Sequence, residues 1–205
     1  MPGADAPCQS DTLPYRYRAH DAMLRRLLSR SRFDESTHRL YDTMVERARE
    51  PVFFADLGVP DTLDGRFEMN VLHGLLIMRR LRRIEEGGAE AAQSLFDLML
   101  ADFDSALRQI GVGDLKVGSR IKQMGQAFYG RAAALNAALA DGAESDALKE
   151  ALRRNTFGTV EAKEDHLTVF EAYVRGQEAH LDSQPDDALL AGDLTLVSPG
   201  HASTD

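Results

Sequence analysis

The chain contains a single cysteine, Cys8, among its 205 residues. One thiol cannot form an internal disulfide or a cysteine-based metal site, and it fits a reducing compartment. The first residues, MPGADAPCQSDTLPYRYR, have no apolar segment of the kind that signal peptides carry, and they include Asp5 and Asp11. They therefore predict neither a secretory signal nor an organelle transit peptide.

Long apolar runs are also missing. The longest uninterrupted stretches, such as GLLIM at residues 74–78, are far shorter than the ~20 residues that a membrane-spanning helix needs. We expect a soluble protein, so that any contact with a membrane would be peripheral.

Positive charge is scarce and unevenly placed. The formal net charge is −9, which argues against nucleic acid as a partner because that partner requires a basic surface. Six arginines and one acid lie between Tyr15 and Arg32, and no lysine or arginine follows Arg175. The basic segment could contact a membrane surface, a ribosome or an acidic partner, or it could simply be a solvated helix face.

The usual signatures of catalysis do not occur. The chain has no HExxH zinc motif, no GxSxG nucleophile elbow and no GxxxxGK[ST] phosphate loop. It also lacks the paired aspartate-rich motifs of helical prenyl-transfer enzymes. We therefore predict that the protein is not an enzyme and that it holds no metal or other cofactor.

Helical periodicity fills most of the chain. Apolar residues recur at three- and four-residue spacing between capping residues and glycine stops, and no strand-period run competes with them. The expected helices span residues 19–29, 34–49, 62–86, 89–110, 117–140, 145–155 and 161–181. The fold class is therefore all-α, a single-domain bundle of about six to seven helices with flexible termini. We expect a flexible tail over residues 1–14, a helical domain over 15–182 and a disordered acidic tail over 183–205.

Two polar groups on these helices have a chemical and a structural interpretation. His73 shares a helix stripe with Arg66 and Asn70, so it could line a polar groove or bind haem, but a hydrogen-bonded core histidine is the simpler reading. Asp97 and Asp104 share a helix flank and could serve acid–base chemistry or bind Mg²⁺. The simpler explanation is an ion pair of Asp104 with a neighbouring arginine one turn away. A haem-handling protein or a small-molecule enzyme using His73, Asp97 and Asp104 is the alternative function.

The loop PVFFADLGVPDT precedes the helix at 62–86. Its Phe53, Phe54, Val59 and Pro60 could dock a partner or could be buried under the bundle. At its end, Asp61 or Thr62 can cap the helix.

Several segments together resemble the ubiquinol–cytochrome c chaperone family, whose members assist assembly of the cytochrome bc1 complex. The resemblance covers roughly residues 40–155 and rests on AR at 48–49, PVFFADLGVPDT at 51–62, DGRFE at 64–68, LH at 72–73, RRLR at 79–82, LFD at 95–97, DFD at 102–104, GVGDL at 111–115, VG at 117–118 and FYGR at 128–131. Phe54, where tyrosine is expected, and Gln109-Ile110, where acidic Glu-Met is usual, are small departures.

The resemblance implies an assembly chaperone that binds newly made cytochrome b, or another bc1 subunit, together with a small co-chaperone. In mitochondrial relatives the chaperone acts near the ribosome exit and holds cytochrome b until haem is inserted. Without a transit peptide, we expect a bacterial member in the cytoplasm, peripheral at the inner face of the inner membrane.

We further expect residues 53–66, 113–116 and 129–131 to form one partner-binding surface. Its fixed charges would orient the client, and its exposed apolar groups would cover the apolar side chains of the client. The residues are Phe53, Phe54, Asp56, Val59, Pro60, Asp61, Arg66, His73, Asp114, Lys116, Tyr129 and Arg131.

Overall fold

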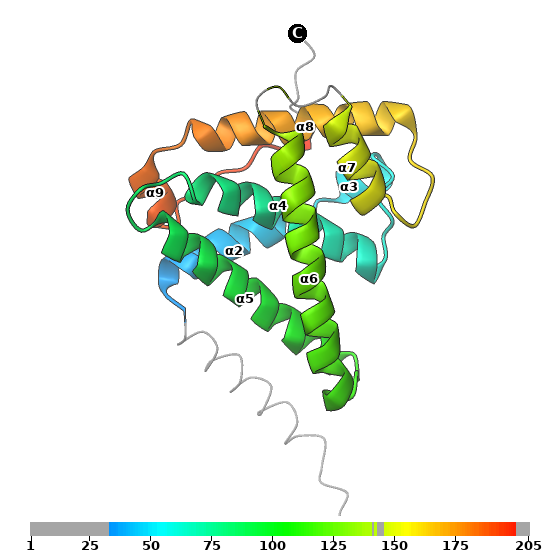
Figure 1. Cartoon of the computed structure of the whole chain (residues 1–205), viewed down its shortest axis with the longest axis horizontal. Coiled ribbons are helices and arrows are strands. Elements are labelled where there is room, and N and C mark those ends of the chain that lie inside the picture. Colours follow the sequence, from blue (N-terminus) through cyan, green and yellow to red (C-terminus); the bar gives the residue numbers. More distant parts are fainter. Residues whose placement is uncertain (1–32, 141, 143–145, 200–205) are drawn as a thin grey trace, which may run out of the picture. The chain divides into compact units, whose positions relative to one another are not determined.

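The computed structural model describes residues 33–140, 142 and 146–199. Within these residues every regular element is a helix, which confirms the all-α prediction (Figure 1). The helices are α2 (Glu35–Ala48), α3 (Pro51–Ala55), α4 (Leu63–Leu81), α5 (Gly88–Gln109), α6 (Asp114–Ala138), α7 (Ala147–Asn155), α8 (Glu164–Asp182) and α9 (Asp186–Leu190). The expected tail at 1–14, the basic helix at 19–29 and the cap at Ser145 lie outside the described residues.

Helix α4 is the centre of the bundle. It contacts α2, α5, α6, α8 and α9, and its residues Met69, Met78 and Leu81 are fully buried on different sides of the helix. This agrees with the apolar residues that the sequence places around most of its circumference. The Thr62 hydroxyl starts the helix by accepting a hydrogen bond from the Gly65 amide at 3.1 Å.

Helices α5 and α6 form a hairpin on one side of α4. Gly111 follows α5 with a φ of 84°, and this left-handed conformation ends the helix. Glycine adopts it easily because it has no Cβ atom. The Phe96 and Phe128 rings, 4.7 Å apart, join the two helices. Beyond them α7 packs on α6, and α8 packs on α7 and α4 (Figure 1).

One expected loop contains a helix instead. Proline at residue 51 predicts the end of the preceding helix, because proline cannot continue a helix, yet it occupies the first turn of α3, where its missing N–H costs no hydrogen bond. Phe53 then points into the core and is completely buried.

The expectation of a disordered tail from residue 183 is wrong for residues 183–199. Helix α9 and the segment after it bury Leu189, Leu194 and Leu196 in the core. Arg80 fixes the start of this segment by donating to the carbonyls of Leu181 and Gln184, both at 3.0 Å. The acidic composition of this segment predicts disorder, but its three leucines are spaced so that they pack against the bundle.

No helix among the described residues is long and apolar enough to cross a bilayer.

Candidate functional site

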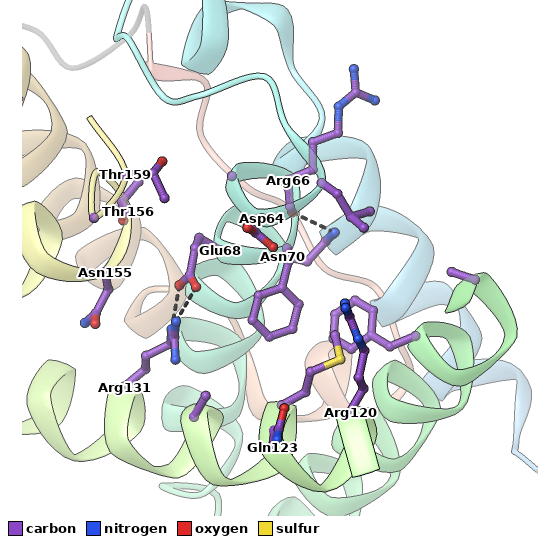
Figure 2. A pocket seen from close by; sticks show the side chains of 18 of the residues that line it. Asp64, Arg66, Glu68, Asn70, Arg120, Gln123, Arg131, Asn155, Thr156 and Thr159 are labelled. Carbon is purple, nitrogen blue, oxygen red and sulfur yellow. Dashed lines mark hydrogen bonds and ion pairs between the residues drawn. The ribbon is translucent and has the colours of Figure 1, made fainter. Parts of the chain in front are cut away.

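A groove of about 730 Å³ opens beside the first half of α4 (Figure 2). The C-terminal half of α5, the N-terminal half of α6 and the connection between α7 and α8 form its other walls. Its lining combines apolar side chains with charged ones: Leu63, Phe67, Phe103, Leu107, Ile110 and Met124 are apolar, and Arg49, Asp64, Arg66, Glu68, Asp102, Arg120, Arg131 and Arg154 are charged.

The apolar wall is partly open to solvent. The Phe67 and Phe103 rings lie 5.0 Å apart and join α4 to α5. At the rim, Leu63 is 59% exposed and Ile110 is 61% exposed. Large apolar side chains this exposed beside a groove are typical of a binding surface.

At one end of the groove, the loop before α4 packs closely against the first turn of that helix. A Cβ atom on Gly65 would lie 1.9 Å from the carbonyl oxygen of Pro60, so only glycine lets the loop approach the first helical turn. This approach brings Asp61 to Arg66, whose Nε lies 2.6 Å from the carboxylate. The pairing lowers the pKa of Asp61 and raises that of Arg66.

A second ion pair lies deeper in the groove. Arg131 donates two hydrogen bonds to Glu68, one of them at 2.5 Å from Nε (Figure 2). The pKa of Glu68 is nevertheless raised, because desolvation outweighs the stabilisation by Arg131. The guanidinium of Arg131 also lies 5.8 Å from the centre of the Phe67 ring.

Three further arginines line the groove. The guanidinium groups of Arg49, Arg120 and Arg154 make no ion pair or hydrogen bond with the part of the chain that the structure describes. They come from the end of α2, from α6 and from the end of α7. We missed them in the sequence because each one alone resembles a solvated residue on a helix.

Asn70 lies at the same groove and is nearly buried. Its Nδ2 donates to the Arg66 carbonyl at 3.0 Å (Figure 2). Its Oδ1 is shielded from solvent and has no hydrogen-bond partner among the described residues.

His73 does not reach this groove. It is 1% exposed, and both ring nitrogens are hydrogen-bonded, Nδ1 to the Met69 carbonyl at 2.8 Å and Nε2 to the Tyr173 hydroxyl at 2.7 Å. Burial lowers the pKa of His73 to about 4, so the ring is neutral. The structural interpretation of His73 is therefore correct, and neither nitrogen is free for haem.

The predicted partner surface is only partly assembled. Arg66 and Arg131 line the groove together, and Phe54 and Asp61 line an adjoining hollow. The expected exposure of Val59 is wrong, because Val59 and Phe53 are buried in the core. Asp56, Asp114 and Lys116 are exposed outside the groove, and Pro60 is half-buried. Tyr129 is 62% exposed and packs on Phe96 and Phe128.

The acidic flank of α5 forms ordinary surface contacts. Asp104 pairs with Arg108 at 2.6 Å, as the spacing predicts, and Asp97 accepts a hydrogen bond from Gln93 at 2.9 Å. Among residues 33–140, 142 and 146–199, no three histidine, cysteine, aspartate or glutamate side chains are grouped to hold a metal ion.

Comparison with known proteins identifies one family. A family model described as ubiquinol-cytochrome C chaperone matches residues 55–196, more than half of the chain. The crystal structure of the Cbp3 homolog from Brucella abortus is similar, with a TM-score of 0.73 and 32% identity over 89% of this chain and 98% of that one.

Curated relatives agree with this match. The chain is 25% identical over 158 residues to human ubiquinol-cytochrome c reductase complex assembly factor 1, which covers 77% of this chain and 52% of the human protein. The corresponding Xenopus laevis protein is 26% identical over 159 residues, covering 76% of this chain and 78% of that protein. The chain thus spans about half the length of the human relative.

Proposed function

Because the chain belongs to the ubiquinol-cytochrome C chaperone family, we propose that it is an assembly factor for the ubiquinol–cytochrome c reductase complex that binds newly made cytochrome b. The observation that carries this proposal is the family match over residues 55–196. The names of the human and Xenopus relatives, which are assembly factors for that complex, support it.

The groove beside α4 suits such a role. A membrane subunit before insertion exposes apolar side chains next to polar loops. The groove offers apolar side chains such as Leu63 and Ile110 next to arginines, so it can cover both kinds of surface for a short time. Groups exposed in this way give a reversible contact, which a chaperone needs in order to release its client.

Binding rather than catalysis is the activity that we propose. The carboxylates Asp97 and Asp104 are engaged in surface contacts, and His73 is enclosed in the core. The same proposal includes a small co-chaperone as second partner and contact of the basic segment at residues 15–32 with a membrane or ribosome. It also includes a location at the inner face of the bacterial inner membrane.

Deletion of the gene tests this function. We expect a reduced-minus-oxidised spectrum of the membranes to lose most of the cytochrome b signal of the complex, together with ubiquinol oxidation. Expression of the wild-type chain should restore both. Unchanged cytochrome b in the deletion strain would refute the proposed function.

A further inference from the structure

The hollow surface beside α4 is larger than the main groove alone. A second hollow of about 380 Å³ adjoins the groove and shares Arg49 and Arg66 with it. Each hollow alone has the volume of a small-molecule pocket. Side by side they form an open, extended surface, which fits a segment of polypeptide.

The charge of this surface is opposite to that of the protein as a whole. The chain has a net charge of −9, yet five arginines line the main groove against the three carboxylates of Asp64, Glu68 and Asp102. Arg49, Arg120 and Arg154 make no ion pair within the part of the chain that the structure describes, so they are available to carboxylates on a partner. The groove therefore selects for negative charge.

The same surface also requires apolar contacts. Exposed Leu63 and Ile110 stand at its rim, and Phe67 and Phe103 form the wall between them. A partner with carboxylates alone would leave this wall open to water, and an uncharged apolar partner would leave the arginines unpaired. Only a segment that carries both kinds of side chain satisfies the groove.

We propose that the groove binds an amphipathic polypeptide segment whose carboxylates flank its apolar side chains. This inference rests on the proposed function, since the segment would belong to the client. Recognition combines two known modes, an amphipathic segment laid in an apolar groove and acidic groups held by an arginine cluster.

A direct binding experiment tests the inference. The probe is a fluorescein-labelled amphipathic peptide of about 14 residues with leucines on one face and glutamates on the other, measured by fluorescence anisotropy with the full chain. We expect binding that weakens as salt rises, since exposed charge pairs are screened. Matched peptides with lysine in place of glutamate, or with serine in place of leucine, should bind at least tenfold more weakly.

Variants of the protein locate the site. The triple variant R49E/R120E/R154E should weaken binding of the acidic peptide at least tenfold, and R82E should change it less than twofold. Arg82 is the control because it is exposed, has no partner among the described residues and lies at the opposite end of α4 from the groove. Likewise L63S/I110S should weaken binding, whereas V169S, at a position 42% exposed on α8, should not.

Three outcomes would overturn the inference. One is equal binding of the lysine peptide, and another is an equal loss with R82E and with the triple variant. The third is complete displacement of the peptide by vesicles that contain anionic phospholipid, which would make the groove a lipid site.

The inference and the proposed function can fail separately. If the triple variant stays folded by circular dichroism and restores cytochrome b in the deletion strain as well as the wild-type chain does, the acidic-segment inference falls while the chaperone function stands.

Discussion

The Tyr173 hydroxyl donates a hydrogen bond to Nε2 of His73, with 2.7 Å between the oxygen and the nitrogen. The direction is fixed by chemistry: the carbonyl of Met69 can only accept, so Nδ1 of the neutral imidazole carries the hydrogen and Nε2 is the acceptor. The bond joins α4 to α8 inside the core, beside the buried ring of Phe53.

The buried His73 predicts that the protein is destabilised by mild acid. Its pKa is about 4 in the folded protein and near 6.5 in the unfolded chain, so between these values only the unfolded state takes up the proton. Stability should therefore fall as pH decreases from about 6.5 to 4, by roughly 3 kcal/mol from this group. Urea unfolding at pH 7 and pH 5 measures the effect. H73Q should show a smaller loss between the two pH values than the wild type, and an equal loss would contradict this role of His73.

The hydroxyl of Tyr173 should contribute to stability through the same bond. Y173F leaves Nε2 of His73 buried without a donor, at an expected cost of about 1–3 kcal/mol. A double-mutant cycle of Y173F with H73Q in urea unfolding isolates the pair. Strictly additive effects would show that the two side chains do not interact.

The segment after α9 should be required for full stability. Leu196 is 9% exposed, and its carbonyl accepts a hydrogen bond from Arg47 at 2.7 Å. Nearby, the Val197 amide donates to Gln177 at 2.9 Å. L196A should lower the free energy of unfolding by about 2 kcal/mol or more. D193A, which removes only a surface ion pair, should cost less than about 1 kcal/mol, and equal effects of the two would count against this packing.

Two glycines should respond to alanine in opposite directions. At Gly65 the new methyl group would meet the Pro60 carbonyl at 1.9 Å, so G65A should displace the loop at the groove and destabilise the protein. At Gly125, within α6, nothing lies within 4 Å of the new methyl group, so G125A should stabilise the helix by about 0.5–1 kcal/mol. Thermal melting of both variants is the test, and a melting temperature that rises with G65A would contradict this close packing of the loop.

The sequence predicted the long helices well because their periodicity and caps are local properties. The Asp34 carboxylate accepts from the Thr37 amide at 2.7 Å, as expected of the residue preceding α2. Helix α3 is not predicted by the sequence pattern, because a proline is equally suited to follow one helix and to begin the next. The segment after residue 183 was missed because only the assembled bundle offers its leucines a place to pack.

The site was harder to predict than the fold. Arg66 and Arg131 were recognised from the family pattern, and both line the groove. Arg49, Arg120 and Arg154 lie far apart in the sequence, so only the packing of α2, α6 and α7 brings them to one surface. The burial of Val59 likewise depends on the turn of the loop after α3, which the residue pattern does not specify.

Capture of the nascent client tests the central claim most directly. Cells that express the tagged wild-type chain are pulse-labelled, the chain is isolated, and labelled cytochrome b is compared with a labelled membrane protein of similar length from another complex. We predict that cytochrome b is enriched after the pulse and declines during the chase, as it enters the complex. Equal recovery of the two membrane proteins, or no recovery of cytochrome b, would contradict the account.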